Sequence, residues 1–158
     1  MHFFGILLGA VAPALAQGNL ELQPFVGFRW AGAIRSSDSD PAQIMLNNSP
    51  VAGAAFTFRS SQILSFETQW VSQWTTGVSA AGTTRIGAHQ FLLNCLLDTS
   101  PATGALQPYI LFGAGANVIT GAEQGGAKWA WGAGGGVRYF FRRRFGIRVQ
   151  MRYAATTL

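Results

Sequence analysis

The chain has 158 residues, a formal net charge of +5 and 49% hydrophobic residues, which is enough for one domain with a sizeable core. Only 11% of the residues are charged, whereas soluble domains carry roughly 25%, so a surface that faces only water is disfavoured. The basic residues are dispersed along the chain and lie in no recognition motif, which argues against a nucleic-acid partner.

The first 17 residues, MHFFGILLGAVAPALAQ, have the pattern of an export signal. The segment from Phe3 to Ala12 is apolar, and Ala14-Leu15-Ala16 is a small-x-small site of the kind that signal peptidase cleaves. We therefore expect residues 1–16 to be a signal peptide and residues 17–158 to be the mature domain; a buried N-terminal helix is the alternative. Beyond residue 16 no run of about 20 apolar residues occurs. A mature chain that crosses a membrane must then do so as a closed barrel.

The mature chain alternates apolar and polar residues with a period of two, which is typical of strands with two different faces. In LELQPFVGFRW, for example, Leu22 and Phe28 belong to one face and Glu21 and Arg29 to the other. The same alternation predicts seven strands, at residues 20–33, 50–59, 63–74, 84–97, 107–119, 128–141 and 145–154. A water-soluble sandwich would show the same period, but with its apolar face in the core and its charged face in solvent.

The glycine-rich stretch WAWGAGGGVRYFF belongs to one of these strands. Period two places Trp129, Trp131 and Tyr139 on one face and most of the glycines on the face that carries Arg138. An eight-stranded barrel is just wide enough to be filled by side chains, so glycines on one wall make room for long side chains from another. A phosphate-binding loop would need G-x-G-x-x-G before a helix, but Val137 takes the sixth position and no helical period follows.

Long and short connectors alternate along the predicted strands. Outer-membrane barrels place short turns at the periplasmic end and longer loops outside, so we expect external loops near residues 35–49, 75–83 and 120–127. The tight turn Arg142-Arg143-Arg144 then faces the periplasm. The link at 97–107 is longer than this rule predicts.

Aromatic residues give an orientation that does not depend on loop length. In this topology the external strand ends carry Trp30, Trp74, Trp129, Trp131 and Tyr153, and the periplasmic ends carry Tyr139 and several phenylalanines. Two interfacial belts are typical of a protein in a bilayer. The arginine turn, residues 142–144, is either a solvated turn or a contact with anionic lipid headgroups.

Charged residues share the polar faces of four predicted strands: Glu21, Arg29, Glu67, Arg138, Arg148 and Arg152. In a narrow barrel we expect them to form a network of paired charges that fills the lumen, because an unpaired charge there is costly. A narrow porin-like channel is the alternative. Its excess of arginine would favour anions, although the expected radius leaves little room for water.

Three features occur together in this sequence: the signal-like start, Pro108-Tyr109-Ile110 before FGAGAN, and GAGGGVRYFF followed by a short turn and FGIRVQMRY. With these features the chain resembles the small outer-membrane β-barrel family related to the transmembrane domain of outer-membrane protein A. The resemblance covers nearly the whole mature chain. It implies an all-β, antiparallel, up-and-down barrel of eight strands in the Gram-negative outer membrane, without a cofactor. The expected partners are lipopolysaccharide, phospholipid and the barrel-assembly machinery.

Two departures from this family concern the strand count and the end of the chain. Bacterial single-chain barrels have an even number of strands, whereas seven are predicted, and the sequence ends in AATTL without a terminal aromatic residue. We therefore expect the last strand to be missing; the alternative is that two strands are merged into one in this count.

An enzymatic function would need a catalytic group on the lipid-facing wall. Some small barrels that resemble this one remove acyl chains from lipid A with a histidine, a serine and an acidic residue. After cleavage only His89 remains, and no serine lies on its predicted strand. Zinc and calcium ligand spacings are absent from the sequence. We expect a non-enzymatic structural or surface-interaction role, with a lipid A deacylase or a lipocalin-like soluble barrel as alternatives.

Overall fold

The computed structural model describes residues 5–8, 15–17, 19–31, 33–34, 44–46, 48–79, 82–99, 105–120, 126–142 and 145–156. All regular elements within these ranges are β-strands, and they join in one sheet. The described residues include no helix that is long and apolar enough to cross a membrane.

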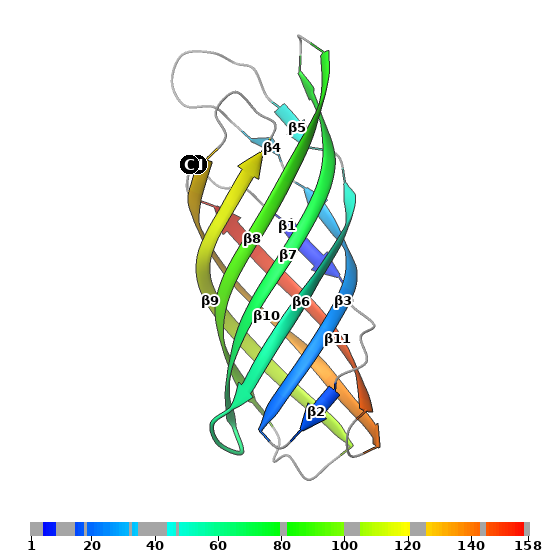
Figure 1. The fold of residues 1–158 in the computed structure, drawn as a ribbon, viewed down its shortest axis with the longest axis vertical. Helices are drawn as coiled ribbons and strands as arrows, with labels where there is room; N and C mark the ends of the chain where they lie inside the picture. Colours follow the sequence, from blue (N-terminus) through cyan, green and yellow to red (C-terminus); the bar gives the residue numbers. More distant parts are fainter. Residues whose placement is uncertain are drawn as a thin grey trace.

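Seven long antiparallel strands curl into a barrel (Figure 1). They are β3 (Leu20–Ala31), β6 (Ser49–Arg59), β7 (Leu64–Ser79), β8 (Gly82–Asp98), β9 (Leu106–Thr120), β10 (Gly126–Arg142) and β11 (Phe145–Thr156). Each pairs with the next long strand along the chain. Four short strands accompany them: β1 (Gly5–Leu8), β2 (Leu15–Gln17), β4 (Ala33–Ile34) and β5 (Ile44–Leu46). The predicted all-β, up-and-down architecture is confirmed.

The place of an eighth strand, between β3 and β11, is occupied by β1. Residues 5–8 pair with residues 28–31 of β3 and with residues 151–154 of β11, so they bridge the first and last long strands. The seven long strands agree in number with the seven predicted from the sequence, and β1 adds only four paired residues between the first and the last of them. A sheet edge carries unpaired N–H and C=O groups, which an extended segment can satisfy.

The short strand β2 pairs with residues 20–22 near the start of β3. Both β1 and β2 contain residues of the expected signal peptide, and residues 1–4 and 9–14 of that segment lie outside the described residues. Cleavage before Gln17 would remove β1 and expose the edges of β3 and β11.

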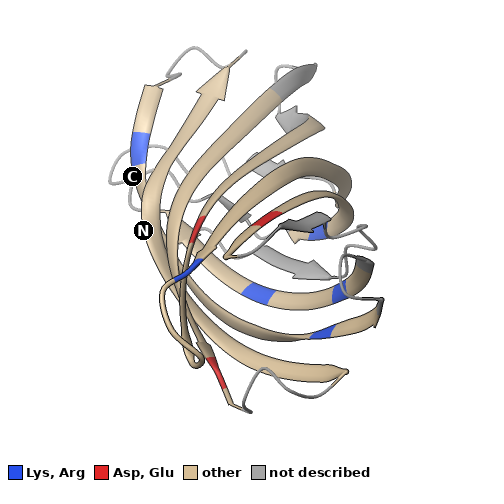
Figure 2. Cartoon of the chain, turned by 60° about the horizontal axis from the view of Figure 1, so that its bottom comes forward, with Lys and Arg blue, Asp and Glu red and all other residues tan. Residues whose placement is uncertain are grey.

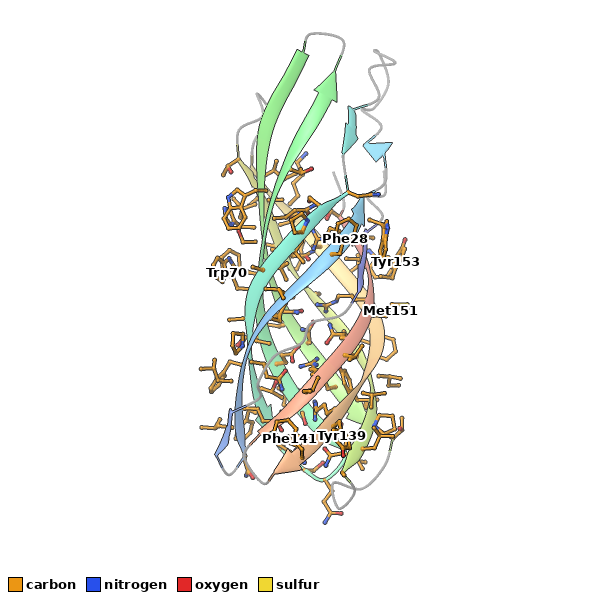
Figure 3. The ribbon with its side chains drawn as sticks, turned by 90° about the vertical axis from the view of Figure 1, so that its right-hand side faces the viewer. Phe28, Trp70, Tyr139, Phe141, Met151 and Tyr153 are labelled. Carbon is orange, nitrogen blue, oxygen red and sulfur yellow. The ribbon has the colours of Figure 1, made fainter. Side chains whose placement is uncertain are left out.

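The polar face of the sheet is buried and its apolar face is exposed, which is the reverse of a water-soluble barrel. Along β3, Glu21, Gln23 and Arg29 are buried, whereas Leu22 and Val26 are exposed. The same inversion holds on the other long strands, where the exposed set includes large aliphatic and aromatic side chains. Figure 3 shows Phe28, Trp70 and Met151 pointing outward from the barrel wall. Because exposed apolar surface of this extent is unfavourable in water, the outer wall is suited to lipid.

The glycines of β10 leave space inside the barrel, as predicted. A Cβ atom on Gly136 would lie 2.5 Å from the Tyr109 hydroxyl oxygen. A Cβ atom on Gly132 would lie 3.0 Å from Arg152 Nε. The glycine-rich stretch is thus the middle of a strand whose missing side chains accommodate long side chains from β9 and β11.

The predicted external loop at residues 75–83 is wrong in extent. Strand β7 continues to Ser79 and β8 begins at Gly82, and these two residues pair directly. The strands extend here because Thr75, Thr76 and Val78 are β-branched residues, which favour a pleated conformation. This hairpin rises above the other strands at the upper end of Figure 1. Most of the other two predicted loops, 35–49 and 120–127, lies outside the described residues.

Candidate functional site: the lumen and the outer wall

The structure places all six charged residues expected in the lumen with buried side chains on the inner face of the sheet. Figure 2, viewed obliquely from the lower end, shows the charged positions on strands that curl around one axis. Of the six, only Glu67 and Arg148 form an ion pair with each other. The other four find different partners.

The centre of the lumen is crossed by the Arg148–Glu67 pair. The Glu67 carboxylate accepts hydrogen bonds from Arg148, from Thr57 at 3.1 Å and from the Asn94 amide at 2.9 Å. Arg148 Nε also donates to the Tyr109 hydroxyl at 2.5 Å, and its guanidinium lies 4.7 Å from the centre of the Tyr109 ring. These residues come from five different strands, so the cluster ties opposite walls together across the barrel.

Two further ion pairs lie near the lower end, where β6 and β8 end. Arg138 pairs with Asp98 at 3.3 Å, and Arg59 pairs with Glu21 at 3.2 Å. Asp98 and Arg59 were not among the residues expected in the lumen, because Asp98 falls in a predicted connector and Arg59 lies at the end of a predicted strand. The alternation could have found both residues. Asp98 has the same parity as the buried Asn94, and Arg59 the same parity as the buried Thr57.

Towards the upper end, Arg29 and Arg152 are buried without a carboxylate partner among the described residues. Amide oxygens accept their hydrogen bonds: Gln73 (3.0 Å) and Gln90 (2.9 Å) for Arg29, and Gln69 and Asn94 for Arg152. Their guanidinium groups are therefore hydrogen-bonded but not neutralised.

The outer wall carries the aromatic residues expected at the membrane interfaces. The side chains of Trp30, Trp74, Trp129, Trp131 and Tyr139 are exposed, and Tyr153 is half-buried with its ring 5.9 Å from that of Trp131. Figure 3 shows Tyr153 in the upper part of the barrel and Tyr139 and Phe141 at its lower end. Arg143 and Arg144 lie outside the described residues, as does the side chain of Arg142.

His89 lies on the outer face, beside a serine that the sequence did not place there. No serine shares its strand, but Ser72 of β7 is its direct cross-strand partner, with Ser72 Oγ 3.2 Å from His89 Nδ1. The imidazole packs between Trp70 and Trp74, with ring centres 6.5 Å from each. A hydrogen-bonded serine and histidine are therefore present on this wall, although the Ser72 side chain is only 1% exposed.

The described residues contain no group of three or more histidine, cysteine, aspartate or glutamate side chains placed to hold a metal ion. The lumen offers guanidinium, carboxylate, amide, phenol and hydroxyl groups. The outer wall offers indole and imidazole rings and the Ser72 hydroxyl.

Comparison with known proteins yields a likeness of fold. No protein-family model matches the chain, and no curated protein matches it. The chain is similar in structure to the outer membrane protein OprG from Pseudomonas aeruginosa, with a TM-score of 0.53 and 11% sequence identity over 98% of this chain and 92% of OprG. At this level of identity the likeness supports the fold alone. The fold of this chain is that of an outer-membrane β-barrel.

Proposed function

We propose that this protein is a non-enzymatic β-barrel of the bacterial outer membrane with a structural or surface-interaction role. The observation that carries the proposal is the inverted distribution of side chains. Arginine, glutamate and glutamine fill the interior, whereas tryptophan, phenylalanine and leucine cover the exterior. This arrangement is stable where hydrocarbon surrounds the sheet, because the polar groups satisfy one another inside.

The lumen favours a closed barrel over a narrow porin-like channel. The central cluster crosses the interior, and Leu96 and Leu111 are fully buried beside Tyr109. Lower down, Arg138 stacks on the same ring, 4.8 Å from its centre. A conducting path would have to displace these contacts, which hold the walls together.

The proposed partners follow from the outer wall. Exposed tryptophan and tyrosine side chains at two levels fit the two headgroup regions of a bilayer of phospholipid and lipopolysaccharide. Residues 142–144 would add contacts with anionic headgroups at the lower end, each worth about 1 kcal/mol. Export by a signal peptide at residues 1–16, insertion by the barrel-assembly machinery and membership of the outer-membrane-protein-A-like family belong to the same proposal.

Refolding the mature protein into detergent micelles tests the proposal. The measurement is migration in an SDS gel with and without heating. A closed barrel resists SDS until heated, so we expect a band that shifts on boiling. Partition of the protein into buffer without detergent, with no heat-dependent shift, would contradict it and favour a soluble ligand-binding barrel.

A lipid A deacylase is a second candidate function, which the Ser72–His89 hydrogen bond favours. Ser72 would act as nucleophile and His89 as base. Against it, Ser72 is buried, and the carboxylates of the described residues that would orient the histidine all lie in the lumen. Mass spectrometry of lipid A from cells that express the wild type, Ser72→Ala or His89→Ala decides between the candidates. Loss of acyl chains that requires both side chains would establish the enzyme.

A further inference from the structure

The charges in the described lumen are unevenly distributed along its axis. The central and lower parts contain three arginines and three carboxylates, which pair as Arg148–Glu67, Arg138–Asp98 and Arg59–Glu21. The upper part contains Arg29 and Arg152, and among the described residues no carboxylate accompanies them. Counted over the described residues, the lower lumen is therefore neutral and the upper lumen carries excess positive charge.

A third cation belongs to the same region. Lys128 follows the inward parity of β10, between the exposed Ala127 and Trp129 and two residues before the fully buried Ala130. Its cross-strand partner is Asn117 of β9, whose side-chain oxygen is buried without a hydrogen-bond partner among the described residues. Lys128 thus adds a positive charge at the upper end of the lumen.

Arg29 and Arg152 donate to amides at two levels of β7 and β8. Arg29 donates to Gln73 and Gln90, whereas Arg152 donates to Gln69 and Asn94, four residues lower on each strand and next to the central cluster, because Asn94 also donates to Glu67. Arg152 is 2% exposed, and its Nε has no hydrogen-bond partner among the described residues, so one strong donor is unused in the interior.

Amide oxygens satisfy the hydrogen bonds of these arginines but supply no full negative charge. A buried guanidinium without a counter-charge is costly, and the cost falls when an anion joins it. Guanidinium groups suit planar or tetrahedral oxyanions, because their N–H groups form parallel hydrogen bonds to two oxygens. An oxyanion would therefore supply the counter-charge that the described residues lack.

We propose that the upper lumen is a binding site for a small oxyanion such as inorganic phosphate. Arg152 donates from its unused Nε, and Arg29 and Lys128 supply further positive charge. The Arg148–Glu67 cluster and the Tyr109 ring close the lumen below, so the anion enters and leaves by the upper end. Lipid phosphates are excluded because the site faces the interior. The inference requires only the folded barrel and goes beyond its proposed role in the membrane.

Isothermal titration of the refolded protein with inorganic phosphate, in a non-ionic detergent at constant ionic strength, tests the site. The wild type is expected to bind phosphate saturably. Arg152→Gln, which keeps a polar side chain but removes the charge, is expected to weaken binding about 10- to 100-fold, the effect of one hydrogen bond to a charged group. Arg29→Gln is expected to act in the same direction.

The matched control is the double variant Arg138→Gln/Asp98→Asn, which removes a lower ion pair without changing the net charge. It is expected to bind phosphate like the wild type. The heat-dependent gel shift shows for each variant that the barrel has formed, so a folding failure is distinguishable from a binding failure. Absence of saturable binding in folded wild type overturns the site. Equal binding by Arg152→Gln, or equal loss in the control, does the same.

Discussion

Replacing Glu67 by glutamine removes the only carboxylate at the centre of the described lumen. Its side chain is 0% exposed and accepts hydrogen bonds from Arg148, Thr57 and Asn94. Glutamine presents an N–H group to one of these donors and leaves the Arg148 guanidinium without its counter-charge. Removing one partner of a buried ion pair costs about 3–5 kcal/mol. We expect this loss in the free energy of unfolding of Glu67→Gln.

Urea unfolding of the refolded barrel, followed by the heat-dependent gel band, measures the effect. Urea slopes of roughly 1–3 kcal/mol per M are typical of small proteins, so a loss of at least about 3 kcal/mol lowers the midpoint by about 1 M or more. Thr68→Val is the control, because Thr68 is the next residue along β7 and is exposed on the outer wall.

The double variant Glu67→Gln/Arg148→Gln separates the ion pair from general packing. Removing both charges leaves neither one buried alone, so the double variant should recover part of the loss, with a coupling energy of about 2–3 kcal/mol. Additive losses, or a Glu67→Gln midpoint equal to that of the control, would refute the assignment of Glu67 as the central counter-charge.

Three further predictions concern the wall and the N-terminus. Gly136→Ala should cost about 1–3 kcal/mol by urea unfolding, because the new methyl group meets a tyrosine hydroxyl at 2.5 Å, whereas Gly126→Ala has open space and should be neutral. The Leu93 side chain is 68% exposed on the middle of the outer wall, so Leu93→Arg should lower the free energy of unfolding in lipid by about 2–4 kcal/mol. Trp129→Arg, at the interface, should lower it by only about 0–1 kcal/mol. Equal losses would contradict a lipid-facing wall. Mass spectrometry of the exported protein should give Gln17 as its first residue, and an intact Met1 would show that the signal is retained.

Period-two alternation was sufficient to predict the fold and the side on which each of the six expected lumen charges lies. Glu21 and Arg29 are buried and Val26 is exposed because a one-residue step reverses the face of a strand. The alternation does not predict which residues meet across the lumen. That Glu67 reaches Arg148, 81 residues away, depends on the curvature of the whole sheet and on the tilt of its strands.

The register between neighbouring strands was also inaccessible from sequence. Ser72 meets His89 because β7 and β8 are joined by a tight hairpin that pairs Ser79 with Gly82. The sequence predicts a loop over that hairpin, and a different loop length shifts every cross-strand pair. A correct turn assignment would have found the serine beside the histidine, since Ser72 and His89 lie equally far from the Ser79–Gly82 pair in an antiparallel register.

The predicted cleavage before Gln17 would change how the edges of β3 and β11 are paired. Among the described residues, no strand pairs with residues 23–27 of β3 or 145–150 of β11 on the sides that face each other. In hydrocarbon each unsatisfied backbone group costs several kcal/mol, so β1 lowers this cost over only part of the barrel height. Cleavage before Gln17 removes even that bridge, and the mature sheet must then pair its two edges with each other or with another chain. Cross-linking of cysteines introduced at Val26 and Val149, one on each edge strand, distinguishes closure within one chain from pairing between two copies.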